Sequence, residues 1–203
     1  FVKDASRNSF FLVKELLSKI RGLVPEGNAE GLKSIVRAVP DWPKKGIMFR
    51  DITTLLKDKA AFNSAMDLLV SRYHGMDIDA IAGIEARGFI TGAVLAHRLG
   101  LGFIPIRKKG KLPAETVSEE YTLEYGKSEV EVHKDAISRG LKVLVVDDLI
   151  ATGGTALAAC RLVEKLGGKV VECCFLIDLP DLGGSAKLKK AGYESFSMMQ
   201  FEG

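Results

Sequence analysis

Residues 143–155 read Val-Leu-Val-Val-Asp-Asp-Leu-Ile-Ala-Thr-Gly-Gly-Thr. The apolar run stops at two adjacent carboxylates, a short loop of small and hydroxyl-bearing residues follows, and a helical pattern begins at position 156. This order predicts a buried strand, a turn and a helix, which is the repeating unit of α/β folds. Because parallel sheets bind ligands beyond the carboxyl ends of their strands, we expect this stretch to form a binding site.

The rest of the chain alternates strand and helix patterns in the same way. Apolar runs predict buried strands at residues 80–84, 103–106, 141–146 and 170–177. Helical spacing predicts helices at residues 9–22, 31–38, 60–73, 89–99 and 156–166. Alternating residues on both sides of Gly126 indicate an antiparallel strand pair. The sequence therefore predicts an α/β fold with a mostly parallel central sheet flanked by helices.

The groups at the end of the 143–146 strand suit a phosphorylated sugar. Asp147 and Asp148 can accept hydrogen bonds from a vicinal diol and can hold a hydrated Mg²⁺. Residues 151–155 offer backbone N–H groups at a helix start, where an anion is stabilised, and Thr152 and Thr155 add hydroxyl donors. A plain strand–turn–helix with Thr152 as the N-cap is the structural alternative, and it leaves the acidic pair unexplained.

Composition excludes several other kinds of site. The chain has no Gly-x-x-x-x-Gly-Lys-Ser/Thr and no Gly-x-Gly-x-x-Gly, which argues against a P-loop and a dinucleotide fold. A net charge of +3 argues neither for nor against nucleic acid, and the short basic patch at 107–111 suits a phosphorylated small molecule as well as a polynucleotide. No nucleic-acid partner is expected. No apolar run is long enough for a membrane span. Three cysteines without metal-ligand spacing favour buried thiols in a reducing, cytoplasmic compartment.

Residues 145–155 resemble the phosphoribosyl-pyrophosphate motif of type I phosphoribosyltransferases. Three further segments are similar to those of the family members that act on adenine: Gly-Ile-Met-Phe-Arg-Asp-Ile at 46–52, Gly-Ile-Glu-Ala-Arg-Gly-Phe at 83–89, and Gly-Lys-Leu-Pro at 110–113 continuing to Tyr-Thr-Leu-Glu-Tyr-Gly-Lys at 121–127. The resemblance runs from about residue 31 to near the C-terminus. Residues 1–30 fall outside it and are expected to form a helical extension.

The resemblance implies a role for each matching residue. The ribose and its 5-phosphate would be bound by Asp147, Asp148, Ala151, Thr152, Gly153, Gly154 and Thr155. Pyrophosphate would be bound by Glu85, Ala86, Arg87, Arg107, Lys108 and Lys111, with a cis peptide expected between Glu85 and Ala86. Adenine would be bound by Met48, Phe49 and Arg50, although by sequence alone a core aromatic is the better interpretation of Phe49. Glu124 would be the catalytic acid–base, and Tyr125 would belong to the lid.

The resemblance also implies a reaction. Adenine and phosphoribosyl pyrophosphate would give AMP and pyrophosphate in a Mg²⁺-dependent reaction with an oxocarbenium-like transition state. The metal would be carried mainly by the substrate, with Asp147 and Asp148 as the candidate protein ligands. We also expect a small hood at about 31–55, a mobile lid at about 108–126 and a homodimer.

Two alternatives stay open at this point. The first is a transferase for another purine, such as xanthine or hypoxanthine. The second is a regulator that binds phosphoribosyl pyrophosphate without catalysis. Regulators with this fold carry an added winged helix, and residues 1–30 are too few to form one.

Glu124→Gln is expected to reduce turnover strongly, about 100-fold or more, because a general acid–base group contributes on that order. Binding of phosphoribosyl pyrophosphate should be spared. Steady-state kinetics together with calorimetric titration of the sugar separate the two effects, and unchanged turnover would remove Glu124 from the mechanism.

Overall fold

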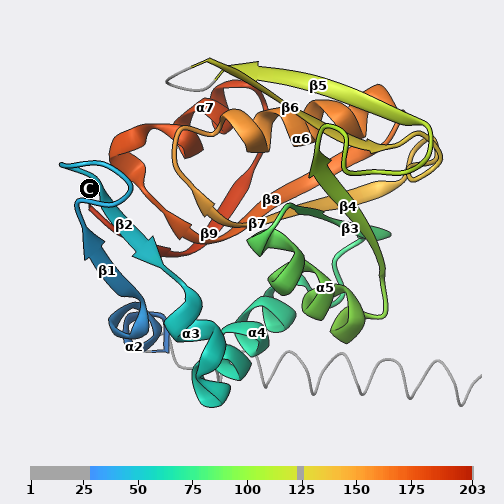
Figure 1. Cartoon of the computed structure of the whole chain (residues 1–203). Helices are drawn as coiled ribbons and strands as arrows, with labels where there is room; N and C mark the ends of the chain where they lie inside the picture. The colour runs from blue at the N-terminus through green and yellow to red at the C-terminus, as the bar shows by residue number, and fades with distance from the viewer. Residues whose placement is uncertain (1–27, 123–125, 203) are drawn as a thin grey trace, which may run out of the picture.

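The computed structural model describes residues 28–122 and 126–202 (Figure 1). The described helices are α2 (Asn28–Ile35), α3 (Thr53–Lys57), α4 (Lys59–Tyr73), α5 (Arg87–Leu99), α6 (Gly154–Lys165), the 3-10 turn η1 (Pro180–Leu182) and α7 (Gly184–Lys190). The described strands are β1 (Arg37–Pro40), β2 (Met48–Asp51), β3 (Ala80–Ile84), β4 (Gly102–Lys108), β5 (Thr116–Thr122), β6 (Lys127–His133), β7 (Lys142–Ile150), β8 (Lys169–Asp178) and β9 (Ser195–Gln200).

In the described part of the chain, a seven-stranded sheet has the order β5-β6-β4-β3-β7-β8-β9. The strands from β4 to β9 in this order pair in parallel, whereas β6 pairs antiparallel with both β4 and β5. The predicted α/β fold with a mostly parallel sheet is confirmed, and so is the antiparallel pair on either side of Gly126.

The sheet has a hydrophobic core on each face. Helices α2 to α5 pack against one face, and α6 with α7 packs against the other (Figure 1). Cys173 and Cys174 are neighbours on β8 and fall in different cores, as alternation along a strand requires. Cys160, Cys173 and Cys174 are buried free thiols, which agrees with the sequence-based interpretation.

A separate two-stranded sheet of β1 and β2 stands beyond one end of the main sheet. It is fixed to the C-terminal segment through Arg50, which donates a hydrogen bond to the carbonyl of Glu202 (2.9 Å) and lies over the Phe201 ring. The Lys33 ammonium of α2 lies 5.2 Å from the centre of the same ring. Cation–π contacts of Lys33 and Arg50 with the Phe201 ring therefore hold residues 28–51 to the segment that follows β9.

Several predicted boundaries were wrong. The helix expected at 31–38 ends at Ile35, and residues 37–40 pair with β2, because Pro40 disfavours helix at the residue before it. The strand expected at 141–146 continues to Ile150, so the acidic pair lies inside the strand. The elements that were not predicted are α3, the 3-10 turn η1, α7, β9 and the two strands β1 and β2. The helix expected at 9–22 lies outside the described residues.

The sheet divides between β3 and β7. The helix after β3 covers one face, and the helix after β7 covers the other, so this is the point where the chain winds in opposite directions. Ligands of open α/β sheets bind in the crevice at such a switch point. Among the described residues, no helix is both long and apolar enough to cross a membrane.

The first turn of α5 lies against the backbone of β7. A Cβ atom on Gly88 would stand 2.7 Å from the Val146 carbonyl oxygen and 2.9 Å from the Asp147 carboxylate. Gly88 is therefore the residue that allows α5 to approach the strand that carries the acidic pair.

Gly88→Ala is expected to destabilise the protein by roughly 1–3 kcal/mol, because the added methyl overpacks a rigid backbone contact. Gly31→Ala is the matched control, since that helical glycine has no atom within 4 Å of a built Cβ. The control should be neutral or stabilising, by up to about 1 kcal/mol. Urea unfolding measures both, and equal effects would contradict the close-packing argument.

Candidate active site

A cavity of about 740 Å³ opens at the switch point, at the carboxyl ends of β3, β4 and β7. Its walls are made by Ile84, Glu85, Ala86, Arg87, Ile106, Lys108, Lys111, Tyr121, Val130, Asp147, Asp148, Leu149 and Thr155. The structure therefore brings together candidate residues from three separate stretches of sequence, 85–87, 108–111 and 147–155. Such a size suits a ligand with several functional groups.

The acidic pair at the cavity floor is asymmetric. Asp148 is buried and accepts a hydrogen bond from Arg87 Nε at 2.5 Å, so its charge is balanced by a cation at the start of α5. Asp147 lines the cavity, and its Oδ1 accepts the Asp148 backbone N–H at 2.9 Å. Burial, and secondly the charge of Asp148, raise the pKa of Asp147 well above its ordinary value. Among the described residues, Asp148 therefore has a cation as its ion-pair partner, whereas Asp147 has none.

Residues 151–155 form a small concave loop beside the main cavity. This pocket of about 110 Å³ is lined by Asp147, residues 149–156 and the first turn of α6. The N-cap of α6 is Gly153 at φ +73°, with no side-chain hydrogen bond, so Thr152 is not the cap that the structural alternative required. Without a capping side chain, the N–H groups of the first turn are left for an anion.

The loop of residues 151–155, here named the cradle, packs against a second segment of the chain. A Cβ on Gly153 would stand 2.8 Å from the Gly184 carbonyl oxygen, and a Cβ on Gly184 would clash with the carbonyl of Ala151. The start of α7 therefore supports the loop backbone directly. Sequence reasoning missed Gly184, because nothing in the 143–155 stretch indicates which later segment packs behind it.

The loop after β3 carries the expected non-proline cis peptide between Glu85 and Ala86. The Glu85 carboxylate accepts hydrogen bonds from Arg107 Nε and Nη2, both at 3.1 Å, and from the Lys108 backbone N–H at 3.2 Å. The hydrogen bond from Arg107 is the main reason why the pKa of Glu85 lies below its ordinary value, and the Lys108 N–H adds to it. Glu85 thus serves as an acceptor that fixes the end of β4.

The side chains of the basic patch at 107–111 point to different partners. Lys108 and Lys111 line the cavity, as expected for groups that meet an anion. Arg107 is directed to Glu85, and its Nη1 donates to the Lys111 carbonyl at 3.0 Å, so it is absent from the cavity wall in the described part of the chain.

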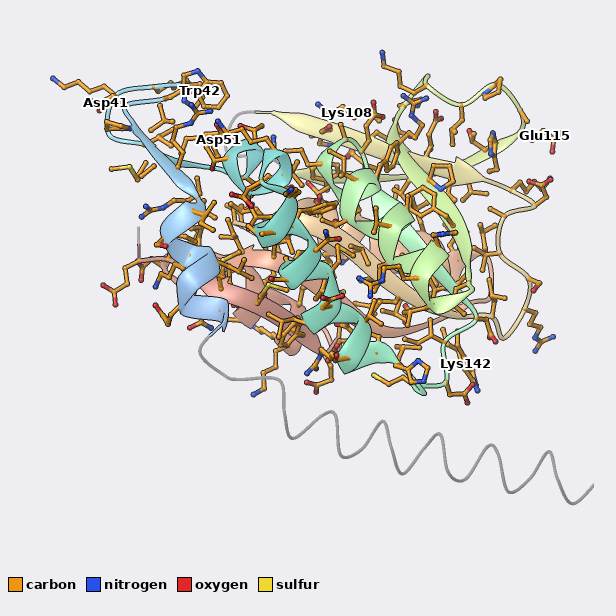
Figure 2. All side chains as sticks on the ribbon, turned by 90° about the horizontal axis from the view of Figure 1, so that it is seen from below. Asp41, Trp42, Asp51, Lys108, Glu115 and Lys142 are labelled. Carbon is orange, nitrogen blue, oxygen red and sulfur yellow. The ribbon has the colours of Figure 1, made fainter. Side chains whose placement is uncertain are left out.

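The β1–β2 hairpin faces this site through Phe49. The Phe49 ring lies edge-on to Trp42, with ring centres 4.3 Å apart, and the Arg87 guanidinium lies 5.8 Å from the Phe49 ring centre. Phe49 is half-buried and not part of either core, so its alternative reading as a core aromatic is wrong. Trp42 is 51% exposed and lies beside Asp41 at the tip of the hairpin (Figure 2).

Two predicted site residues fall outside the described part of the chain, and two residues of the cavity wall were not predicted. Glu124 and Tyr125 lie outside the described residues. Val130 and Leu149 line the cavity without having been singled out. Alternation around Val130 was visible in the sequence but did not say which face would meet the cavity, and Leu149 lay beyond the predicted end of its strand.

The carboxylates of the cavity wall can hold a metal only together with other ligands. Within residues 28–122 and 126–202, no group of three or more His, Cys, Asp or Glu side chains could hold an ion by itself. Two adjacent carboxylates on a cavity wall fit Mg²⁺, which is usually bound through one or two carboxylates together with substrate phosphates and waters. The residues present therefore suit a metal that arrives with the substrate.

Comparison with known proteins identifies the class. The family model described as "Phosphoribosyl transferase domain" matches residues 51–197. Adenine phosphoribosyltransferase from Chlorobium luteolum is 59% identical over 174 residues, which cover 85% of this chain and 98% of that protein.

Solved structures agree with this. Adenine phosphoribosyltransferase from Thermoanaerobacter pseudethanolicus superposes with a TM-score of 0.82 at 53% identity, covering 85% of this chain and 99% of that one. The Saccharomyces cerevisiae enzyme, complexed with an imino-altritol bisphosphate and adenine, gives 0.80 at 38% identity, with coverage of 85% and 99%. The chain therefore belongs to the phosphoribosyltransferase family, and within it to the adenine phosphoribosyltransferases.

Asp147→Asn and Asp148→Asn are expected to act in opposite directions on stability. The folded-state pKa of Asp147 is raised above its unfolded value of about 4, so its contribution to stability is greatest below that pH and declines as the pH rises toward the folded-state pKa. Asp147→Asn removes this titration and should raise the unfolding temperature at neutral pH. Asp148→Asn leaves Arg87 without its anion and should lower it.

Both variants should bind phosphoribosyl pyrophosphate more weakly, by about tenfold or more, since each loses a charged acceptor. Thermal melts of both variants and the wild type between pH 5 and pH 8, with calorimetric titration of the sugar, measure the two effects. Identical pH profiles for the wild type and Asp147→Asn would contradict the raised pKa.

Proposed function

We propose that this protein transfers the phosphoribosyl group of phosphoribosyl pyrophosphate to adenine, forming AMP and pyrophosphate. The observation that carries this most directly is the position of Arg87. Its guanidinium pairs with Asp148 on the sugar side and lies over Phe49 on the hairpin side. Residues proposed for the sugar and the pyrophosphate thus line one cavity, and Phe49, proposed for the base, lies beside Arg87 of its wall, as a transfer between two neighbouring substrates requires.

Donor binding is assigned to β7 and the loop after it. Asp147 and Asp148 accept hydrogen bonds from the ribose hydroxyls, and the backbone of residues 151–155 with Thr152 and Thr155 binds the 5-phosphate. The support for this assignment is the uncapped start of α6, where N–H groups and the helix dipole favour an anion.

Departure of pyrophosphate is assigned to the cationic wall. As the bond to the anomeric carbon breaks, positive charge develops on the ribose and negative charge on the leaving group. Arg87, Lys108 and Lys111 line the cavity where the leaving group would lie, and the 85–86 loop supplies backbone groups beside them. Bound Mg²⁺, held by the substrate with Asp147 and Asp148 as its protein ligands, would add further neutralisation of the pyrophosphate.

The base is assigned to the hairpin. The backbone of Met48 and Arg50 reads the Watson–Crick edge of adenine, and the Phe49 ring stacks on it, which the position of Phe49 next to Arg87 supports. Glu124 exchanges the imidazole proton, with Tyr125 in the lid beside it. Lid closure over residues 108–126 would keep water from the activated sugar.

Further features extend the same proposal. Residues 31–203 form the transferase domain, with a hood at about 31–55, and residues 1–30 are an extension to it. The enzyme acts as a homodimer in the cytoplasm. Three buried free thiols are consistent with a reducing compartment.

A purine panel tests the proposal. Adenine, hypoxanthine, guanine and xanthine are each incubated with phosphoribosyl pyrophosphate, with and without Mg²⁺, and release of pyrophosphate is followed. We expect release with adenine, at least about 100-fold above the other bases, because backbone groups matched to one base edge are left unpaired by another. Removal of Mg²⁺ should abolish it. Faster turnover of hypoxanthine than of adenine would show that hypoxanthine is the base that accepts the phosphoribosyl group. Binding of phosphoribosyl pyrophosphate without release of pyrophosphate would indicate a regulator.

A further inference from the structure

The connection from β4 to β5 crosses over β6. These two strands lie on either side of β6, so residues 109–115 must pass across the end of that strand. We name this segment the crossing loop. Figure 2 labels Lys108, the last residue of β4 before the loop, and Glu115, the last residue of the loop. The Lys109 N–H bonds to the Glu129 carbonyl of β6 at 3.1 Å, but N–H groups further along such a loop need another acceptor.

Glu131 on β6 supplies that acceptor. Its Oε1 accepts the backbone N–H groups of Lys111 and Leu112, each at 3.0 Å, and its Oε2 accepts the Thr116 hydroxyl at 3.2 Å. Val130 and Val132, on either side, pack in the core, so alternation turns Glu131 toward the loop. The loop in turn covers the carboxylate, which is only 4% exposed.

The other side-chain ties of the crossing loop are more exposed. Arg107, whose side chain is 31% exposed, donates to the Lys111 carbonyl at 3.0 Å, and two ion pairs lie on the surface. Lys109 pairs with Glu129, and Glu115 pairs with Lys134, in ion pairs whose cations are 64% and 65% exposed. Exposed pairs of this kind contribute little, because water screens them and the side chains lose freedom. A buried carboxylate that accepts three hydrogen bonds holds its partners much more firmly. Glu131 is therefore the dominant restraint on the crossing loop.

The held segment carries cations to the active-site cavity. Lys108 and Lys111 both line the cavity wall, and Lys111 is also a residue whose backbone N–H is bonded to Glu131. Three lysines lie within residues 108–111, and their mutual repulsion would favour a loop spread into solvent. The buried carboxylate opposes that spreading and holds Lys111 and Leu112, near the start of the proposed lid, before any ligand binds.

We propose that Glu131 is a positioning residue for the pyrophosphate end of the substrate, acting through the crossing loop and not by contact. The inference rests on the proposed function for the identity of that substrate. By keeping Lys108 and Lys111 on the wall in the free protein, Glu131 lowers the ordering cost that binding would otherwise carry. It has no part in base recognition, since the β1–β2 hairpin lies apart from the crossing loop.

Three substitutions test this. Glu131→Met keeps the length of the side chain and leaves both loop N–H groups without an acceptor. Glu131→Gln is the conservative variant, because its amide oxygen can accept from Lys111 and Leu112 while its amide NH₂ donates to the Thr116 hydroxyl. Glu129→Met is the matched control: it removes an exposed tie to the same loop from the same strand.

Binding of phosphoribosyl pyrophosphate is measured by calorimetry in the presence of Mg²⁺, and KM for each substrate is measured beside it. Glu131→Met should weaken sugar binding by about 10- to 100-fold, since two buried donors lose their acceptor. Its KM for adenine should change by less than about twofold, and Glu129→Met should change neither value by more than that. Glu131→Gln should remain within about threefold of the wild type.

Several results would overturn the inference. These are unchanged sugar affinity in Glu131→Met, an equal loss in Glu129→Met, or an equal rise of KM for both substrates, which would indicate general disorder of the fold. Because affinity is measured without turnover, failure of the proposed function is a separate result. A wild type that binds the sugar and releases no pyrophosphate refutes the transferase and leaves the Glu131 comparison intact.

If Glu131→Met does not melt cooperatively, Thr116→Val takes its place, since it removes one of the three donors and keeps the shape of the side chain. It should weaken sugar binding by about threefold and speed tryptic cleavage within the crossing loop, in line with the loss of one hydrogen bond. Unchanged affinity and unchanged cleavage would refute the positioning role.

Discussion

The contact between the start of α5 and the backbone of β7 is the constraint on which the site depends. Gly88 permits it, because any side chain there would meet Val146 and Asp147. Through this contact, the loop that carries Arg87 reaches the strand that carries Asp148, and the ion pair between them closes the floor of the cavity. The switch point supplies the crevice, and the absence of a Cβ on Gly88 allows α5 to lie close against β7 beside it.

A second theme is that the cationic side of the cavity is held by carboxylates. Arg87 pairs with Asp148, Arg107 pairs with Glu85, and the lysine-bearing crossing loop is bound by Glu131. None of these anions is screened on the open surface, so each fixes a cation or its backbone in a defined direction. An incoming polyanion therefore meets charges whose positions are already set, which reduces the reorganisation that binding requires.

Much of this could be predicted from the sequence, and the reasons for success and failure are physical. Apolar runs and helical spacing gave the central strands and α4 to α6, because burial on the sheet imposes those periods. The β1–β2 pair and β9 were missed, since short edge elements depend on partners far along the chain. The 145–155 stretch identified the sugar site, whereas Gly184 and Glu131 act through contacts that no local pattern encodes. Their roles became visible only once the segments behind the cradle and above β6 were in place.

The support of the phosphate cradle by Gly184 bears on how separable the motif is. Residues 151–155 read as a self-contained module, yet their carbonyls and N–H groups stand against the backbone at the start of α7, about thirty residues later. Transplanting the Asp-Asp and Thr-Gly-Gly-Thr stretch onto another strand–helix scaffold would carry over the chemistry and leave behind the surface that shapes it. A designer who wanted this sugar site would have to graft two strands with their following helices, not one loop.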